Sequence, residues 1–332
     1  DDAVRVCLLV AGPAGSCDAR RALDVAGRTA MIGGPVVLVV HPGAPGAKRA
    51  VALSTAEGGA WQLVLDERAE EPELLAAAAD AAAHIKPDRI VPYKTIGAVT
   101  LSVSIFNPPG HAAATPKPGI VFFHGGGFNV GAPSNFYAQA QYLASRGLVA
   151  ISVEYRIRTR HQTTQHEAIM DAFSAMRWVR QHTADLGLDP QRIAVAGGSA
   201  GGFLAAAVTT LSGLDQPGED TSTSTRPNAL ILFNSMIERG PGSRAFAKVE
   251  AAMGAQWKTI SPLHNLYPNF PPTIHFLGRA DKNITVVSAQ KMKTEIEKIG
   301  GRCDLHLYDG QEHGFFNYGR GDNTHYRLTL IA

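Results

Sequence analysis

Residues 192–205 read RIAVAGGSAGGFLA, and this stretch decides the fold. An apolar strand runs to Ala196, and an alanine-rich helix follows from about Gly201. The turn between them fits the pattern G-x-S-x-G, with Ser199 at its centre. A serine on such a strand-to-helix turn is held in a strained backbone conformation that projects its oxygen outward, and small neighbours avoid clashes. We therefore predict that Ser199 is a nucleophile. The alternative, a glycine-rich turn with an incidental serine, is disfavoured by the strand and helix around it.

Strands alternate with helices from residue 89 onward. Strands that are apolar nearly throughout and joined by helices predict an α/β fold with a mainly parallel, doubly wound sheet covered on both faces. We expect strands over 89–96, 99–106, 120–123, 148–153, 192–196, 229–233, 273–277 and 304–308. We expect helices over 135–145, 167–182, 201–211 and 288–299, and a polar surface loop over 212–228. The end of the sequence at Ala332 is expected to cut the last helix.

Residues 1–86 differ in sequence pattern from the rest of the chain. Short β-branched runs separated by Gly- and Pro-rich turns predict strands over 5–10, 35–40, 50–53 and 62–65. A helix is expected over 73–85, with Pro72 just before it, where a helix start tolerates proline. No motif is recognised here. We interpret residues 1–86 as a small β-rich accessory or N-terminal region of unknown role, and residues 89–332 as the catalytic domain. A glycan-binding role for the first region stays open.

Composition excludes several classes of function. The 332 residues are 45% hydrophobic and 18% charged, with a formal net charge of +2, and no segment concentrates Lys and Arg. This argues against nucleic-acid binding, and no apolar run reaches the roughly 18–20 residues of a membrane span. Cys7 and Cys17 could pair in an oxidising compartment, but free thiols explain them equally well. The chain begins at Asp1, which we interpret as a mature or trimmed form, and a secreted or periplasmic location is favoured over the cytoplasm.

A second glycine-rich stretch precedes the serine. His124 is followed by three consecutive glycines after an expected strand. Acyl transfer passes through a tetrahedral oxyanion that needs unobstructed backbone N–H donors. We predict Gly125 and Gly126 as two donors and Ala200, the residue after the nucleophile, as a third. The helix that begins at Ala200 also points its first amides at the site. His124 itself is expected to fix the loop by hydrogen bonds.

An activated serine needs a general base and a carboxylate that orients the base. On this fold the chain order is Ser, then Asp or Glu, then His. His313 lies in a loop just beyond the last expected strand, and Asp281 follows the preceding strand at the same sheet edge. We predict His313 as the base and Asp281 as the acid. Asp309 and Glu312 are rival carboxylates.

Other histidines and aromatics have weaker assignments. His275 and His306 lie inside expected strands, where a satisfied or surface histidine is the default. Phe128 and Phe315 adjoin the two predicted catalytic loops, and we expect them to line a substrate pocket.

Several motifs together carry a family resemblance. They are HGGGF at 124–128, EYR at 154–156, the segment 171–178, GGSAGG at 197–202, Asp281, and EHGF at 312–315. In this combination the chain resembles the microbial α/β-hydrolase serine esterases related to hormone-sensitive lipase. The resemblance covers roughly residues 89–330. It implies hydrolysis of carboxylic esters through an acyl-enzyme, with no metal and no cofactor.

The chain also departs from that family. Gly198 stands where the family usually has Asp, residues 157–165 lack its Ala-Pro-Glu sequence, and no helical cap is evident before residue 86. The segments 261–263 and 271–273 look more like cap-poor acetyl and feruloyl esterases that act on polysaccharides. We expect short-acyl esters, either on small molecules or linked to polysaccharides. A prolyl-oligopeptidase-type serine peptidase is the runner-up, but propeller blades need about 40–45 residues each, and the residues before 119 are too few.

Overall fold

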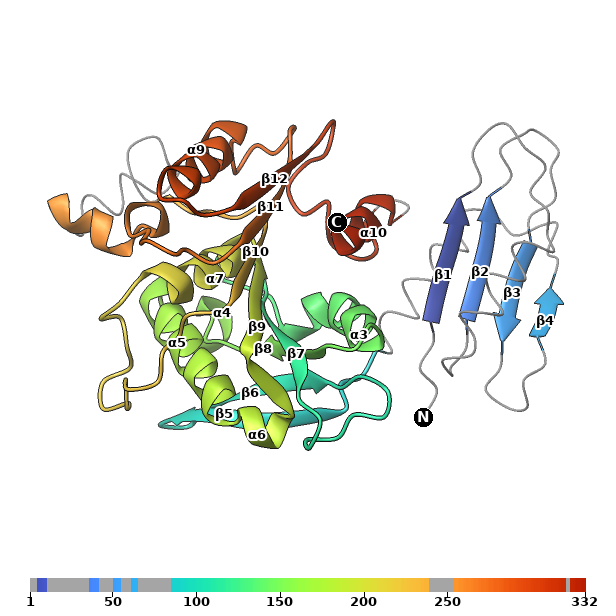
Figure 1. Ribbon diagram of the computed structural model, residues 1–332, viewed down its shortest axis with the longest axis horizontal. Helices are drawn as coiled ribbons and strands as arrows, with labels where there is room; N and C mark the ends of the chain where they lie inside the picture. Colours follow the sequence, from blue (N-terminus) through green and yellow to red (C-terminus); the bar gives the residue numbers. More distant parts are fainter. Residues whose placement is uncertain are drawn as a thin grey trace. The chain divides into compact units, whose positions relative to one another are not determined.

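The computed structural model describes residues 85–238, 254–320 and 323–332, together with four strands nearer the N-terminus. Contacts divide the chain into two compact units, Asp1–Ile85 and Lys86–Ala332. The strands of the first unit are β1 (Arg5–Val10), β2 (Val36–His41), β3 (Ala50–Ser54) and β4 (Trp61–Val64). They form a sheet in sequence order, with β1 and β2 parallel and the other pairs antiparallel (Figure 1). Each lies within one residue of its predicted position. The helix expected over 73–85 falls outside the described residues except for Ile85, and so does Cys17.

An eight-stranded sheet organises the second unit (Figure 1). Its strands are β5 (Arg89–Ile96), β6 (Val99–Phe106), β7 (Lys117–Phe123), β8 (Val149–Val153), β9 (Leu188–Gly198), β10 (Ala229–Phe233), β11 (Thr273–Gly278) and β12 (Cys303–Tyr308). The order across the sheet is β12-β11-β10-β9-β7-β8-β6-β5. Only the pairs β5–β6 and β6–β8 are antiparallel. The predicted α/β fold with a mainly parallel sheet is confirmed.

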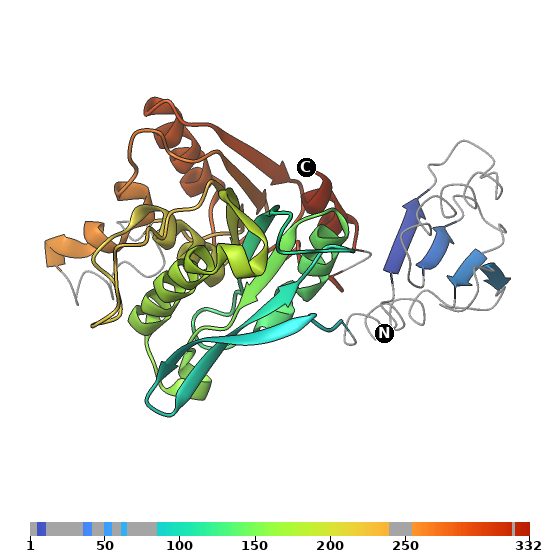
Figure 2. The same ribbon diagram turned by 60° about the horizontal axis from the view of Figure 1, so that its bottom comes forward.

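Helices lie on both faces of this sheet. They are η1 (Pro133–Phe136), α3 (Tyr137–Ser145), α4 (Arg158–His161), α5 (Gln165–Gln181), α6 (Thr183–Leu186), α7 (Ala200–Thr210), η2 (Gly254–Ile260), η3 (Pro262–His264), α9 (Val286–Lys298) and α10 (Thr324–Ile331). Helices α5, α7 and α9 cover one face, and α3 and α10 lie on the other (Figures 1 and 2). Residues 212–228 form the predicted loop. In the described part of the chain, we find no helix long and apolar enough to cross a bilayer.

A capping box sets the start of α5 two residues before its predicted position. The Thr164 hydroxyl accepts a hydrogen bond from the His166 amide at 3.2 Å, and the Glu167 carboxylate accepts one from the Thr164 amide at 2.8 Å. These bonds satisfy amides that have no partner within the helix. The helix thereby starts at Gln165 and presents a long apolar face to the sheet.

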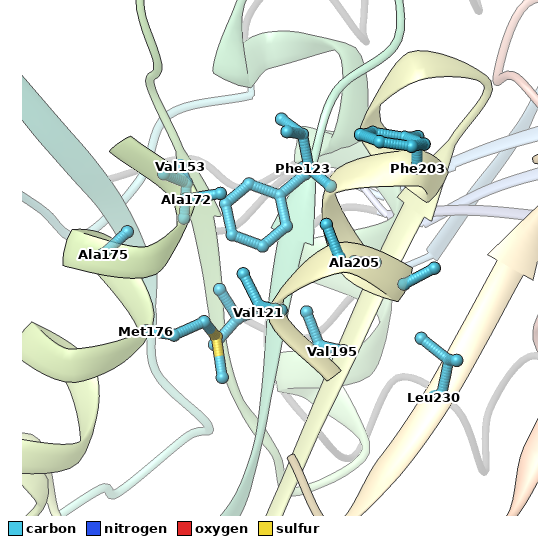
Figure 3. Packing of buried hydrophobic residues seen from close by; sticks show 14 of the residues in the cluster. Val121, Phe123, Val153, Ala172, Ala175, Met176, Val195, Phe203, Ala205 and Leu230 are labelled. Carbon is cyan, nitrogen blue, oxygen red and sulfur yellow. The ribbon is translucent and has the colours of Figure 1, made fainter. Parts of the chain in front are cut away.

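The core under the site is built from the central strands and two helices. Side chains of β7, β8, β9 and β10 pack against α5 and α7 in Figure 3, which labels Val121, Phe123, Val153, Ala172, Ala175, Met176, Val195, Phe203, Ala205 and Leu230. Every residue of α7 is buried. The alanines of α7 let it pack closely against α5 and against β7, β9 and β10, and the helix therefore holds the turn before it on a rigid base.

Candidate active site

The turn between β9 and α7 places Ser199 at the carboxyl end of the sheet. Its backbone is left-handed, with φ 55° and ψ −115°, which costs about 1–3 kcal/mol in a residue other than glycine. The Ser199 amide donates to the Phe233 carbonyl at 2.9 Å and fixes this conformation. A Cβ on Gly197 would lie 2.2 Å from the Gly201 carbonyl oxygen, and one on Gly201 would lie 2.0 Å from the Phe123 carbonyl oxygen. The glycines of the motif are therefore required by close backbone packing.

The structure brings the predicted serine, histidine and aspartate together. His313 Nε2 lies 2.9 Å from Ser199 Oγ, and His313 Nδ1 lies 2.8 Å from Asp281 Oδ2. The buried Asp281 carboxylate accepts a hydrogen bond from Nδ1 of His313, so Nδ1 carries the proton in the neutral ring. Nε2 is then the unprotonated nitrogen, and it can accept the serine proton.

Asp281 is held as a carboxylate by its donors. Its Oδ1 accepts the amides of Asn283 at 2.7 Å and Ile284 at 3.0 Å. Burial raises the pKa of Asp281, but the hydrogen bonds from His313 and from these amides outweigh burial and bring the pKa below its ordinary value. The group is therefore ionised at neutral pH.

The rival carboxylates, Asp309 and Glu312, are not part of this hydrogen-bonded arrangement. Asp309 forms an ion pair with Arg279 at 2.8 Å, and its side chain is 92% exposed. Glu312 is exposed. Among the described contacts of His313, neither carboxylate takes part, whereas Asp281 does.

The two strand histidines differ from each other. His306 is half-buried, with its ring centre 5.3 Å from that of Phe276. His275 is fully buried, and neither ring nitrogen has a hydrogen-bond partner. The expectation of a satisfied or surface histidine is therefore wrong for His275. Its position in β11 directs the ring into the apolar layer of the core, and burial lowers its pKa to about 4, so the ring is neutral.

The glycine loop after β7 lies beside the serine. A Cβ on Gly125 would stand 3.5 Å from the Cβ of Ser199. Gly126 has φ +117°, and its carbonyl accepts the Val130 amide at 3.1 Å, which closes the loop. Among the backbone hydrogen bonds of the described residues, the amides of Gly125, Gly126 and Ala200 donate none. These amides are therefore free to bind an oxyanion.

His124 and Tyr155 fix the glycine loop by hydrogen bonds and ring stacking. His124 Nδ1 lies 2.7 Å from the Gly125 carbonyl oxygen, and its ring stacks on Tyr155 with centres 4.1 Å apart. The Tyr155 hydroxyl donates to the His124 carbonyl at 2.6 Å. Burial lowers the pKa of His124 to about 4, so a neutral ring donates from Nδ1. These contacts agree with the predicted loop-fixing role of His124.

A buried ion network anchors Tyr155 in turn. Arg156 binds Asp171 through Nε and Nη2, each at 2.8 Å, and the Arg156 amide also donates to this carboxylate at 3.0 Å. Lys94 Nζ lies 2.9 Å from Oδ1 of Asp171, the oxygen that Arg156 Nη2 also binds. The network ties the strand end after β8 to α5. Arg156 and Asp171 were expected only through the family resemblance, and Lys94 was not expected at all.

The two predicted pocket aromatics are largely packed. Phe128 is 8% exposed, and its ring stands edge-on to Phe203. Phe315 is 5% exposed and packs against Tyr308. Contact with substrate stays a prediction for both. Val130, in the same loop as Phe128, is 53% exposed and is not singled out by sequence.

Two contacts at the site, those of Asn234 with Asp281 and of Phe316 with Gly198, were not predicted from the sequence. Asn234 Nδ2 lies 2.7 Å from Asp281 Oδ2. A Cβ at Gly198 would lie 2.4 Å from Phe316 Cζ, so the phenyl ring fills the space that a side chain before the nucleophile would take. The ring therefore leaves no room for a larger side chain, such as the aspartate that the resembled family usually has there. The only local signal for Asn234 is a polar residue at the carboxyl end of a parallel strand.

Together, the mainly parallel sheet, the strained serine and its histidine and aspartate partners define the class of α/β-hydrolases. A family model described as "alpha/beta hydrolase fold" matches residues 120–317, and the chain belongs to this family.

Similar proteins include several esterases. The chain is 36% identical over 118 residues to carboxylesterase NlhH of Mycobacterium tuberculosis, which covers 35% of each chain. It is 36% identical over 107 residues to an ethyl acetate hydrolase of Pseudomonas putida, which covers 32% of this chain and 33% of that protein. The matched region thus spans about a third of these curated relatives. Among solved structures, a propionate-bound esterase from Thermogutta terrifontis has a TM-score of 0.70 and 39% identity, over 75% of this chain and 92% of that chain.

Proposed function

We propose that this protein is a carboxylesterase that acts through an acyl-enzyme on Ser199. The observation that carries the proposal is the continuous hydrogen-bonded arrangement from Ser199 through His313 to Asp281, at 2.9 and 2.8 Å. It lies beside backbone amides that have no other acceptor among the described residues. Names of similar proteins, including carboxylesterase NlhH and the Thermogutta esterase, support the same activity.

In the first half-reaction, Ser199 Oγ attacks the ester carbonyl carbon while its proton passes to His313 Nε2. The carbonyl oxygen becomes an oxyanion, which the amides of Gly125, Gly126 and Ala200 bind. When the carbonyl re-forms, the bond to the alcohol oxygen breaks, and His313 returns the proton to the leaving alcohol. The acyl group is now bonded to Ser199 Oγ.

In the second half-reaction, water replaces the alcohol. His313 takes a proton from water, the hydroxyl adds to the acyl carbon, and the carboxylic acid leaves as Ser199 regains its proton. Asp281 stays ionised throughout and stabilises the imidazolium that forms twice in each cycle.

Short acyl groups are the proposed substrates. Related Thermogutta structures hold propionate and butyrate, which supports small acids as products. The alcohol side is proposed to be a small molecule or a carbohydrate, with acetyl and feruloyl groups as the acyl candidates. A panel of p-nitrophenyl esters of increasing acyl length, with acetylated xylan and methyl ferulate beside it, separates these cases. A rate that rises with acyl length would contradict the preference.

The boundary between compact units supports treating residues 1–86 as an accessory region and 89–332 as the catalytic domain. Limited proteolysis near residue 86 should release a fragment that keeps esterase activity. Loss of activity in step with cleavage would contradict this division.

The proposal is tested by Ser199→Ala and His313→Ala with p-nitrophenyl acetate. Each variant should lose several orders of magnitude in kcat while its circular dichroism is unchanged. Ser222→Ala is a matched control that should keep full activity, because the hydrogen bonds of Ser222 with described residues go to Asp220 in the 212–228 loop. Retained activity in Ser199→Ala would refute the proposed nucleophile.

A further inference from the structure

A buried asparagine approaches the predicted acid from the neighbouring strand. Asn234 follows β10, and β11, which pairs with β10, leads into the loop that carries Asp281. The side chain is fully buried, and its Nδ2 lies 2.7 Å from Asp281 Oδ2. The Asn234 amide donates to the Phe276 carbonyl at 2.9 Å, so β11 fixes the backbone of this residue.

The carboxylate of Asp281 is thus surrounded by donors. Oδ2 accepts from both His313 and Asn234, and Oδ1 accepts from the amides of Asn283 and Ile284. Donors on both oxygens favour the ionised form and leave the group no freedom to rotate. Of the four, only Asn234 shares Oδ2 with His313, so only it fixes the direction from which this oxygen meets the imidazole.

A structural role alone explains Asn234 poorly. Its Oδ1 is buried and has no hydrogen-bond partner in the structure. Burying an amide with one unsatisfied oxygen costs stability rather than adding to it. The opposite orientation of the amide would place Oδ1 against an ionised carboxylate, which repulsion forbids. The favourable contact of this side chain is therefore the one with Asp281.

We infer that Asn234 is a positioning residue for the reaction: its Nδ2 fixes Oδ2 of Asp281 against Nδ1 of His313. The inference rests on the proposed esterase function. With Asp281 locked in this direction, His313 keeps its proton on Nδ1 and offers Nε2 to Ser199 in every cycle. Asn234 does not touch the reacting atoms and acts through Asp281 alone.

Few charged side chains of the described residues lie near Asp281 and His313. His313 is the one titratable side chain that the described contacts give Asp281. Arg279 pairs with Asp309, and Lys282 and Glu312 are exposed. A new ionisation placed at position 234 would therefore be felt first by Asp281 and His313.

The test uses the full chain with Asn234→Ala, Asn234→Asp and the matched control Asn228→Asp. Asn228 flanks the opposite end of β10, where its Oδ1 accepts the Ile193 amide, and it is not among the described hydrogen-bond partners of Asp281. With p-nitrophenyl acetate, Asn234→Ala should lower kcat about 10- to 100-fold and leave KM unchanged, because a small displacement of catalytic groups slows chemistry without weakening binding.

The pH profile of Asn234→Asp separates positioning from packing. Two carboxyl groups that share one site cannot both ionise easily, so the new carboxyl stays protonated above the usual range of an aspartate. While protonated, it donates to Asp281 as the amide does, and activity should approach that of the wild type. Once ionised, it repels Asp281, so the ratio of variant to wild-type kcat/KM should fall as pH rises. The same ratio for Asn234→Ala and Asn228→Asp should stay flat.

A flat ratio for Asn234→Asp, or wild-type kcat in a folded Asn234→Ala, would overturn the inference. If Asn234→Ala does not fold, the ratio measured on Asn234→Asp decides alone. Failure of the proposed function looks different: the wild type would then hydrolyse no ester, or Ser199→Ala would retain activity. An active wild type with an inactive Ser199→Ala and unaffected Asn234 variants would reject only the positioning role.

Discussion

A methyl group added at position 198 should strain the loop that carries His313. The backbone of Gly198 is not left-handed, so alanine is allowed there and the effect of Gly198→Ala is purely steric. The new Cβ would lie 2.4 Å from Cζ, 3.0 Å from Cε2 and 3.4 Å from Cε1 of Phe316. Carbon atoms pack at about 3.5–4.0 Å, so the ring or the turn has to move.

The ring has little room to yield. Phe316 is 4% exposed, and its centre lies 4.9 Å from that of Phe233 and 6.0 Å from that of Phe136. Overpacking of this kind costs about 1–3 kcal/mol of unfolding free energy. Because Phe316 follows His313 closely in the chain, its displacement also moves the imidazole, and a shift of about 1 Å can lower kcat/KM about 100-fold.

The assay is a double-mutant cycle with Phe316→Leu, measured by urea unfolding and by kcat/KM on p-nitrophenyl acetate. Leucine lacks the Cζ and Cε atoms that meet the new methyl, so the pair Gly198→Ala/Phe316→Leu should lose less than the sum of the single variants. The expected coupling is about 1–2 kcal/mol in stability. Additive losses, or a Gly198→Ala protein as stable and active as the wild type, would refute the reasoning.

Three further outcomes are expected. Tyr155→Phe leaves the buried His124 carbonyl without its 2.6 Å donor, so urea unfolding should show a loss of about 1–3 kcal/mol, and kcat should fall with KM unchanged. Arg156→Met leaves the buried Asp171 carboxylate with Lys94 but without its bidentate arginine partner. Urea denaturation should therefore show a loss of about 3 kcal/mol in the free energy of unfolding. His275 has a pKa of about 4 when folded against 6.5 when unfolded, so the unfolded chain takes up its proton first and stability falls as pH drops through this window. His275→Leu removes that loss, and its stability relative to wild type should rise by about 3 kcal/mol between pH 7 and pH 4; an unchanged difference would contradict the buried neutral ring.

Local sequence patterns predicted the bounds of those elements whose ends are set by their own residues. The strand over 229–233 has the predicted bounds, and the strand-to-helix turn at Ser199 is where the motif places it. Strands β7 and β9 are exceptions, because they start at Lys117 and Leu188 rather than at 120 and 192. Both extensions come from the pairing of Leu188 with Lys117, and a strand end set by a distant partner leaves no local pattern.

The same distinction applies to the site. Ser199, Asp281 and His313 could be chosen because chain order and strand ends restrict where a triad can lie. Asn234 and Phe316 act through contacts with residues far along the chain, and nothing near them marks that role. His275 was misjudged because alternation in a strand says which face a residue takes but not whether its nitrogens find partners.

The most direct test of the central claim is to map the residue that an organophosphate modifies. A Thermogutta esterase of the same fold is described as phosphorylated by paraoxon. Attack by Ser199 Oγ on the phosphorus of paraoxon would form an O–P bond and release p-nitrophenolate. Mass spectrometry should then find a single diethylphosphoryl group on the peptide that contains Ser199, and none on Ser199→Ala. Modification of a different residue, or equal labelling of Ser199→Ala, would contradict the assignment of Ser199 as the nucleophile.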